Sequence, residues 1–200
     1  MNNCKDIVII GCPRSGKTTL ANLIIKEDTS YHTISLDSLT IAIKKNMQEI
    51  GIKEDSKLEM ISKRIVPFLA SYLYEYKIDY PNIKYLIEGV QINPQHIINE
   101  PFFKNFKIIC LGYPNATIDE IFNNIRKEDE KLQFSYTKKI SDSKLREMIA
   151  FYIRYSVFLQ KKCNEQNIPF YETNKNRETV LNGIYNTLYN NNEICKEYDL

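Results

Sequence analysis

The chain lacks the features that mark several specialised classes of protein. Its 200 residues include no tryptophan, six glycines and two histidines, and no apolar run reaches the roughly 18 residues that a membrane helix needs. Residues 1–6 lead directly into strand-forming residues, without the charged and apolar regions of a secretory signal peptide. We therefore expect a cytoplasmic protein that has no membrane partner.

Cysteine and histidine are too few and too scattered to predict a disulfide framework or a metal centre. The five cysteines are an odd number, and no two of them form a C-x-x-C pair. His32 and His96 lie far apart and lack metal-ligand spacing to a set of cysteines or carboxylates. Both histidines are interpreted as structural residues, and the cysteines lie at positions 4, 12, 110, 163 and 195.

The chain also lacks an excess of charge of either sign. It carries 27 basic and 25 acidic residues, a formal net charge of +2, with 26% charged and 43% hydrophobic residues. Such a balance gives no global argument for binding nucleic acid or an acidic membrane, so no nucleic-acid partner is expected. Any basic site must be local, and the composition is that of an ordinary globular protein.

Short apolar runs alternate with stretches of helical spacing along the chain. The apolar runs are rich in β-branched or aromatic residues and predict five strands, at 6–10, 31–36, 85–88, 106–111 and 168–171. The stretches between them predict helices at 17–27, 37–50, 56–78 and 117–130, one capped by Ser141 or Asp142, and one at 178–190. This alternation predicts an α/β fold in which helices cover both faces of a mainly parallel sheet.

One domain is expected, because no stretch of the chain resembles a linker between two domains. It spans residues 1–190, and residues 191–200 are expected to form a loose polar tail. Two segments exceed what a minimal five-stranded sheet needs. They are the helical region 38–80 and the polar, charge-rich region 126–144.

The strongest signal is the stretch GCPRSGKTT, between the first predicted strand and the first predicted helix. It matches the phosphate-binding P-loop pattern G-x-x-x-x-G-K-[ST], in which glycines allow a tight turn that directs backbone N–H groups at phosphates. Lys17 would reach the β- and γ-phosphates of a nucleotide, and the Thr18 hydroxyl would bind Mg²⁺. The predicted nucleotide-binding residues are Gly11, Cys12, Pro13, Arg14, Ser15, Gly16, Lys17, Thr18 and Thr19.

The side chains of two of these loop residues are not expected to take part in catalysis or to bind phosphate. Cys12 is interpreted as a small filler residue rather than a nucleophile. Arg14 is interpreted as a solvated side chain rather than a phosphate ligand.

Other classes of P-loop protein require motifs that this chain lacks. No D-x-x-G occurs, and the stretch 174–177, NKNR, lacks the aspartate of the N-K-x-D base reader, so a signalling GTPase is not expected. Ring and motor ATPases usually carry a strand that ends in Asp-Glu, whereas the third predicted strand ends in Glu88 followed by Gly89. The class of small kinases remains.

The chain resembles the nucleoside and nucleotide kinase-like P-loop families. The resemblance rests on GCPRSGKTT, on SLDSL after the second strand, and on LIEG, which looks like the corresponding stretch of uridine and phosphoribulo kinases. The segment CNEQNIPFYETN looks like the last strand of a group of small bacterial kinases. The resemblance implies strand order 2-3-1-4-5, an acceptor-binding insert at about 38–80, a lid at about 126–144, and Mg²⁺ and ATP as cofactor and co-substrate.

Acidic and amide residues follow the second and third predicted strands. The carboxyl ends of parallel strands share the edge of the sheet that carries the P-loop, so Asp37 and Glu88 are expected to face the acceptor. Asp37 would take the proton from an attacking hydroxyl or help to hold Mg²⁺, or would only cap the next helix. Glu88 would bind Mg²⁺ or the acceptor, or would be a buried structural carboxylate, and Gln91 would bind the acceptor.

Three arginines are candidates for binding anionic groups. Arg126, within the charge-rich region 126–144, is the candidate for contacting the transferring phosphoryl group, with Arg154 in reserve. Arg64, within the predicted helix 56–78, is the candidate for an anionic acceptor. The alternative for each of them is a solvated helix face.

The predicted function is transfer of the γ-phosphoryl group of Mg²⁺·ATP to a small-molecule acceptor. Lys17, Asp37 and Arg126 are the predicted catalytic residues, and Thr18, Asp37 and Glu88 the predicted metal ligands. The alternatives are a nucleotide-binding switch without turnover and an NTPase without a small acceptor. A second cavity facing the P-loop at 38–80 would favour the kinase, and a tightly packed insert would favour the alternatives. The acceptor, the choice of ATP over GTP and the oligomeric state are left open.

Overall fold

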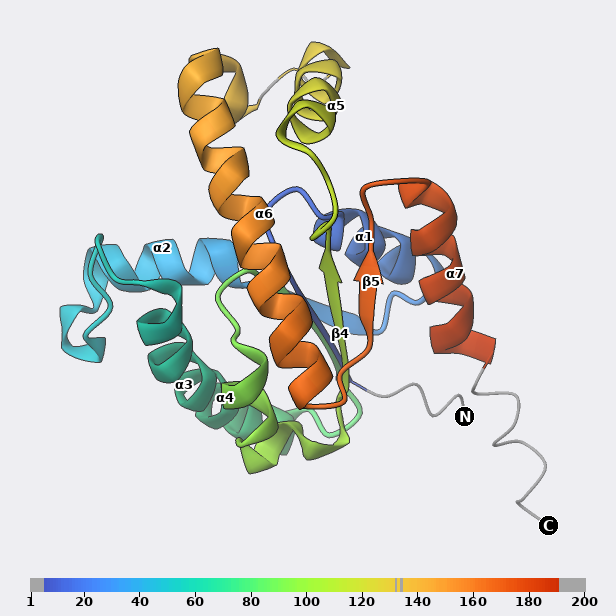
Figure 1. Ribbon diagram of the computed structural model, residues 1–200. Coiled ribbons are helices and arrows are strands. Elements are labelled where there is room, and N and C mark those ends of the chain that lie inside the picture. Colours follow the sequence, from blue (N-terminus) through green and yellow to red (C-terminus); the bar gives the residue numbers. More distant parts are fainter. Residues whose placement is uncertain (1–5, 132, 134, 191–200) are drawn as a thin grey trace.

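A five-stranded parallel sheet forms the centre of the molecule. The computed structural model describes residues 6–131, 133 and 135–190 (Figure 1). The strands lie in the order β2-β3-β1-β4-β5, and every neighbouring pair is parallel. Their bounds are β1 Ile7–Gly11, β2 Tyr31–Ser35, β3 Lys84–Gly89, β4 Lys107–Gly112 and β5 Phe170–Glu172. The predicted α/β fold and strand order are confirmed.

The central strand β1 is buried on both faces, as its continuous apolar sequence predicts. Successive side chains of a strand point to opposite faces, so Val8 and Ile10 join one apolar cluster and Ile7 and Ile9 join the other. All four of these side chains are buried. The period of two thereby divides the core into two layers, one on each side of the sheet.

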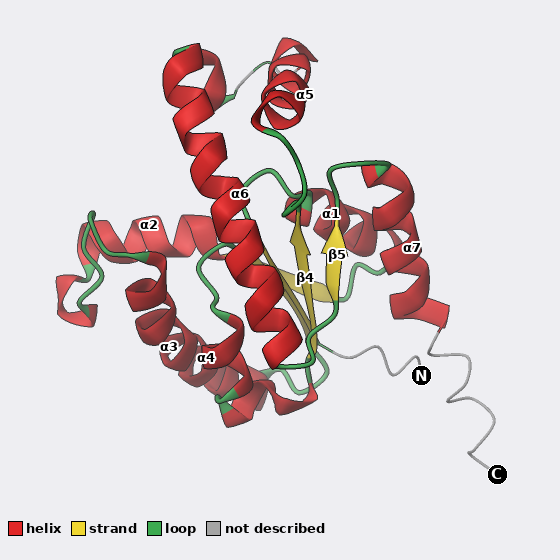
Figure 2. Ribbon diagram, viewed as in Figure 1, coloured by secondary structure: helices red, strands yellow, loops and turns green. Residues whose placement is uncertain are grey.

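The first face of the sheet is covered by α1 (Lys17–Glu27) and α7 (Arg177–Asn190), which lie side by side in Figure 2. Leu20 and Ile24 of α1 and Leu181 and Ile184 of α7 are buried in this layer. Their spacing of three or four residues is that of one helical face.

The other face is covered by α2 (Leu36–Asn46), α3 (Leu58–Asp79), α4 (Pro94–Ile98) and α6 (Asp142–Glu165). Buried side chains of these four helices share one apolar cluster, so the region 38–80 is packed into the core along α3. Short 3-10 turns lie at Gln48–Ile50 and Pro101–Asn105.

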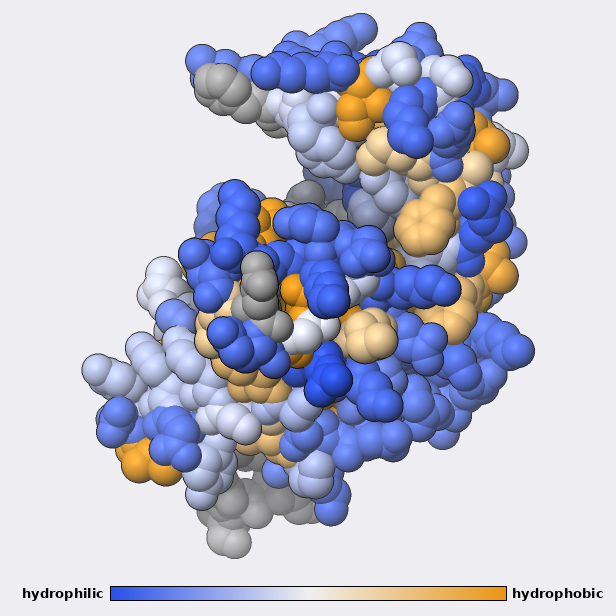
Figure 3. All heavy atoms as spheres, turned by 90° about the vertical axis from the view of Figure 1, so that its left-hand side faces the viewer, coloured by the Kyte–Doolittle hydropathy of each residue, from blue (hydrophilic) through white to orange (hydrophobic). Residues whose placement is uncertain are grey.

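The third part of the molecule projects beyond the carboxyl ends of the strands. It consists of α5 (Ile118–Lys131), the 3-10 turn Tyr136–Lys139 and the first turns of α6 (Figure 1). Thr117 and Glu120 form the predicted capping box of α5: the Glu120 amide donates to the Thr117 hydroxyl, and the Thr117 amide donates to the Glu120 carboxylate. Ser141 caps α6. Figure 3 shows a hollow between this projecting end and the rest of the molecule.

The observed helices differ from the predicted ones in two places. The helix predicted at 37–50 ends at Asn46 and is followed by a separate 3-10 turn. The short helix α4 was not predicted. The tail predicted at 191–200 lies outside the described residues. No helix among the described residues has the length and apolar character needed to cross a membrane.

Candidate active site

The P-loop joins β1 to α1 in a conformation that its glycines permit. A Cβ atom on Gly11 would lie 2.4 Å from the Leu111 carbonyl oxygen and 2.8 Å from Ser15 Oγ, so only glycine fits between the two strands there. Gly16 has a φ of 98°, in the left-handed region, and it immediately precedes α1. The loop thus turns tightly into the N-terminus of α1, where backbone N–H groups can bind an anion.

Lys17 is buried, and its side chain folds back along the loop. Its Nζ atom donates a hydrogen bond to the Cys12 carbonyl oxygen at 3.0 Å. Thr18 and Thr19 are exposed and line a cavity of about 560 Å³, to which Gly16 and Lys17 also contribute. We call this space the phosphate-loop cavity. It contains the residue types that bind the phosphates of a nucleotide.

Cys12 is fully buried beneath the loop. Burial raises the pKa of its thiol, an effect that the nearby Lys17 partly offsets. A thiol with a raised pKa is a poor nucleophile, which agrees with its interpretation as a filler residue.

Glu88 lies at the end of β3, beside Ser35 of β2 in the sheet register. Its side chain is buried, and burial raises the pKa of its carboxyl; Lys17 lowers this pKa, and the negative charge of Asp37 raises it. Its Oε2 atom has no hydrogen-bond partner among the described residues. A buried carboxylate oxygen without a partner is costly unless a ligand satisfies it.

Asp37 and Gln91 are held together beside this carboxylate. Asp37 lies in the first turn of α2, whose N-cap is Ser35, and it accepts a hydrogen bond of 2.6 Å from Gln91 Nε2. Gln91 is buried, and its Oε1 atom has no partner among the described residues. The structure therefore brings Asp37, Glu88 and Gln91 together at the ends of β2 and β3, as their positions after these strands predicted.

The predicted metal ligands are compatible with Mg²⁺. The Thr18 hydroxyl lies close enough to Glu88 to lower the pKa of that carboxyl by a hydrogen bond. The unpartnered Oε2 atom of Glu88 offers an oxygen to a cation or to a water molecule bound to it. The described residues contain no group of three or more His, Cys, Asp or Glu side chains that could hold a metal. Mg²⁺ usually keeps several waters and binds through one or two carboxylates and substrate phosphates, so a single carboxylate such as Glu88 with the Thr18 hydroxyl fits it.

The chain was compared with known protein families, curated proteins and solved structures, and only the solved structures gave matches. No protein-family model matches the chain, and no curated protein matches its sequence. Among solved structures, it is similar to a gluconokinase from Sinorhizobium meliloti 1021, with a TM-score of 0.57, 13% identity and 100% of both chains covered. It is also similar to a shikimate kinase from Bacteroides thetaiotaomicron, with a TM-score of 0.54 and 17% identity, over 92% of this chain and 98% of that one. The chain therefore has the fold of these two solved structures.

Arg126 binds protein groups rather than an open cavity. Its guanidinium donates to the carbonyl oxygens of Thr137 at 2.9 Å and Ile140 at 2.8 Å, and to Asp142 at 2.5 Å. These bonds connect α5 to the segment that leads into α6. The proposed catalytic role of Arg126 stays a prediction, and its observed contacts stabilise the projecting end.

The other two predicted arginines lie away from the phosphate-loop cavity. Arg64 is exposed on α3 and lines a separate cavity with Asp55, Lys57 and Lys63, which shares no lining residue with the phosphate-loop cavity. Arg154 is exposed on α6. Neither arginine lines the phosphate-loop cavity, so the acceptor-binding role of Arg64 and the reserve role of Arg154 stay predictions.

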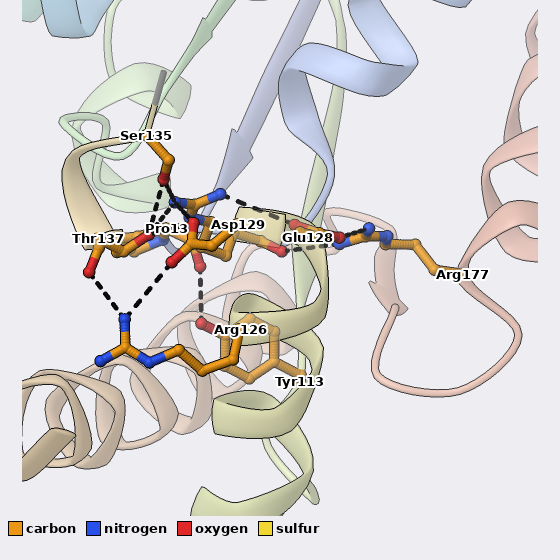
Figure 4. Close-up of polar contacts among 9 residues, drawn as sticks. Pro13, Tyr113, Arg126, Glu128, Asp129, Ser135, Thr137 and Arg177 are labelled. Atoms are coloured by element: carbon orange, nitrogen blue, oxygen red, sulfur yellow. Dashed lines mark hydrogen bonds and ion pairs between the residues drawn. The ribbon is translucent and has the colours of Figure 1, made fainter. Parts of the chain in front are cut away.

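Arg14 is the residue whose placement differs most from its interpretation. It is not solvated: its side chain is 19% exposed and donates to Ser135 at 3.0 Å and to Thr137 at 2.7 Å. It also lies 3.8 Å from Asp129 and packs over the Tyr136 ring. Figure 4 shows Asp129 of α5 and Ser135 and Thr137 of the following segment gathered beside Pro13 of the P-loop. Arg14 therefore links the P-loop to the projecting end.

Another cavity, which was not predicted, adjoins the phosphate-loop cavity. It has a volume of about 330 Å³, and we call it the distal cavity. Tyr113, Thr173 and Asn174 line it together with residues of α5. Both cavities are lined by Arg14, Glu128, Lys131 and Arg177. Arg177 could have been suspected from the sequence, because it begins the helix that follows the last strand, at the same edge of the sheet.

Proposed function

We propose that the protein is an ATP-dependent phosphotransferase that acts on a small-molecule acceptor. The observation that carries this proposal is the position of Glu88, whose buried, unpartnered oxygen lies beside Asp37 and close to Lys17 and Thr18 of the P-loop. An NTP-binding loop alone needs no such carboxylate pair. The pair supports a second substrate at the end of β3.

In the proposed reaction, the P-loop backbone and Lys17 bind the β- and γ-phosphates of ATP. Mg²⁺, bound through Thr18 and a water molecule on Glu88, would offset charge on the transferring group. Lys17 would leave the Cys12 carbonyl oxygen and donate to the phosphate oxygens. Two cavities of about 560 and 330 Å³ with shared walls give the nucleotide a continuous binding surface.

The acceptor hydroxyl would lie against Asp37. Asp37 carries a hydrogen bond from Gln91, which orients its carboxylate, and a carboxylate in this position can take the proton as the hydroxyl attacks. The free Oε1 atom of Gln91 would accept a hydrogen bond from another group of the acceptor. Movement of the projecting end toward the rest of the molecule would close the hollow between them and exclude water from the acceptor (Figure 3).

The test is ADP release from Mg²⁺·ATP in the presence of a panel of acceptors. The panel contains nucleosides, nucleotides, sugars, vitamins and aminoglycosides, and it includes gluconate and shikimate, after which the two similar structures are named. We expect one acceptor to raise ADP release well above the rate with water. Lys17→Ala should abolish that release, whereas Lys26→Ala, which removes an exposed lysine of the same helix, should leave it unchanged.

The second candidate is an NTPase without a small acceptor. The packing of α3 favours it, because Ile61, Ile65 and Leu69 are buried in the core and the cavity beside α3 is separate from the phosphate-loop cavity. Under this alternative, Lys17-dependent ADP release would be the same with every acceptor and with water. A rate that rises with the concentration of one acceptor would exclude it.

A further inference from the structure

Glu128 lies between two arginines that reach it from different parts of the chain. It belongs to α5, and one of its carboxylate oxygens accepts a hydrogen bond from Arg177 Nη2, at the start of α7. Its other oxygen lies 3.7 Å from Arg14 Nη1 of the P-loop. Figure 4 shows Glu128 reaching toward Arg177, away from the cluster around Asp129. One carboxylate thus engages both guanidinium groups.

The two arginines are placed where nucleotide phosphates would lie. Arg14 and Arg177 line the phosphate-loop cavity together with Lys17, Thr18 and Thr19, and both also line the distal cavity. Arg177 Nη1 also donates to the Arg14 carbonyl oxygen at 3.4 Å, which fixes the spacing of the two residues. Guanidinium groups bind phosphate oxygens through paired N–H bonds. The same groups are engaged here by a carboxylate.

We propose that Glu128 is an internal competitor for the nucleotide's phosphate groups and that it sets the affinity of the site for nucleoside triphosphates. In the free protein, Glu128 neutralises Arg14 and Arg177. When a triphosphate enters, its phosphate oxygens replace the Glu128 carboxylate on these arginines, and the carboxylate turns to solvent. This inference rests on the proposed function, because it takes ATP to be the ligand of the P-loop.

The contacts around Arg14 make the exchange feasible. Ser135 and Thr137 accept hydrogen bonds from Arg14, and Asp129 lies 3.8 Å from it, so Arg14 stays in place when Glu128 leaves. The side chain of Asp129 is 6% exposed, whereas that of Glu128 is 30% exposed. Glu128 can therefore reach water by rotating its side chain, and Asp129 cannot.

Competition from Glu128 would lower the affinity of the natural chain for ATP. A binding-competent state that is only partly populated lowers the apparent affinity by that fraction. Replacing Glu128 with glutamine removes the charge that holds the arginines and keeps the side chain's size. We expect Glu128→Gln to bind Mg²⁺·ATP about fivefold more tightly than the natural chain, as expected for the loss of a partly exposed ion pair.

The experiment is isothermal titration calorimetry with Mg²⁺·ATP and with adenosine. Glu130→Gln is the matched control, because Glu130 is exposed on the same helix and its loss changes the net charge equally. Glu130→Gln should bind ATP like the natural chain, and Glu128→Gln should gain affinity for ATP but not for adenosine, which has no phosphate. Adding Arg177→Ala to Glu128→Gln should remove the gain, since the two residues act on one contact.

Two outcomes would overturn the inference, and they distinguish its own failure from a failure of the proposed function. If the natural chain binds ATP and transfers phosphate, but Glu128→Gln binds ATP equally or more weakly, Glu128 is a structural or positioning residue and the inference is wrong. If the natural chain and Glu128→Gln both keep their far-UV circular dichroism spectra and neither binds ATP, the proposed function is wrong and the inference falls with it.

Discussion

Glu88 combines two properties that oppose each other at the scale of a single residue. Burial without a full set of hydrogen bonds destabilises its charged form, yet a charged oxygen in this place is what a magnesium-dependent site requires. Since burial raises the pKa of the Glu88 carboxyl, the folded state binds its proton more tightly than the unfolded state does. This contribution to stability is present below the ordinary pKa of 4.5 and is lost as the pH rises through the folded pKa.

The first prediction is that Glu88→Gln becomes more stable relative to the natural chain as the pH rises above 4.5, the ordinary pKa of the group. Glutamine cannot ionise, so it avoids the unfavourable buried charge. Urea unfolding at pH 4.5 and pH 7.5 would measure the difference in the free energy of unfolding. The same substitution should lower acceptor-dependent turnover by about 10²-fold or more, because the carboxylate is lost.

Glu75→Gln is the control for this pH dependence, because Glu75 is exposed on α3. Its free energy of unfolding should follow that of the natural chain at both pH values. A stability difference between Glu88→Gln and the natural chain that is the same at both pH values would contradict the prediction.

The second prediction contrasts two glycines. Gly11→Ala should lower the free energy of unfolding by about 1–3 kcal/mol, because its Cβ atom would overlap the Leu111 carbonyl oxygen of β4. Gly183→Ala should raise it by about 0.5–1 kcal/mol, because Gly183 lies inside α7 and a Cβ atom there would meet no heavy atom within 4 Å. Urea denaturation of both variants would check these opposite signs. A stabilised Gly11→Ala variant would show that the two strands separate freely at the P-loop.

At this scale, the sequence predicted residues of one continuous motif and residues that follow parallel strands at the same edge of the sheet. The P-loop is one continuous stretch, so Lys17 and Thr18 could be named from the pattern alone. Glu128 and Arg177 are separated by 49 positions, and their contact depends on the packing of α5 near α7. The pairing of Arg14 with Glu128 depends on the same packing, and so Arg14 was misinterpreted as solvated.

At the scale of elements, the contacts of Arg126 hold the projecting end together. Its two backbone acceptors, Thr137 and Ile140, flank the exposed lysines Lys138 and Lys139. The segment between α5 and α6 is therefore attached to α5 through the Arg126 side chain and through Asp129, which accepts a hydrogen bond of 2.7 Å from the Thr137 hydroxyl. Its opening and closing would depend on that attachment.

The third prediction is that Arg126→Ala opens this segment to protease. Trypsin should cleave after Lys138 and Lys139 faster than in the natural chain, since each lost hydrogen bond removes about 1 kcal/mol from the local stability. Arg146→Ala is the control, because Arg146 pairs with Asp119 on an exposed surface where both side chains are at least 43% exposed. Mass spectrometry of the fragments would give the cleavage rates. Unchanged cleavage together with a large loss in kcat would favour the catalytic role of Arg126 instead.

The elements themselves could largely be predicted, because long amphipathic helices and buried strands have clear periodicities. The helix predicted at 178–190 and the observed α7 begin one residue apart, and the predicted capping box of α5 is present. Helix α4 was missed, since five residues are too few to show a period. Its signal was local: Asn93 accepts a hydrogen bond from the Gln95 amide, and Pro94 occupies the first helical position.

At the scale of the whole molecule, a ligand held by the P-loop links distant parts of the fold. The residues that line the two cavities come from the P-loop and the start of α1, from α5, from the loops after β4 and β5, and from the start of α7. Binding of a nucleotide there would stabilise the folded state as a unit, in proportion to the logarithm of its concentration. The strand order that brings these parts together followed from the resemblance to known kinases, because alternation of strands and helices fixes only the fold class.

The fourth prediction is a rise in Tm on addition of Mg²⁺·ATP. At a hundredfold excess over Kd, binding stabilises the folded state by about 2.7 kcal/mol, which corresponds to roughly 5–10 °C for a chain of this size. Differential scanning fluorimetry would measure the shift. Lys17→Ala should abolish it and Lys26→Ala should retain it, and an equal shift in both variants would place the nucleotide outside the P-loop.

The central position of β1 in the sheet has a consequence for synthesis of the chain on the ribosome. Its two neighbours are β3, at Lys84–Gly89, and β4, at Lys107–Gly112, which are translated long after it. A nascent chain that has released β3 can pair β2, β3 and β1, three of the five strands, but the other edge of β1 stays unpaired until β4 emerges. Such an apolar edge is prone to pair with other chains, so this interval of translation is the one in which the protein most needs a chaperone.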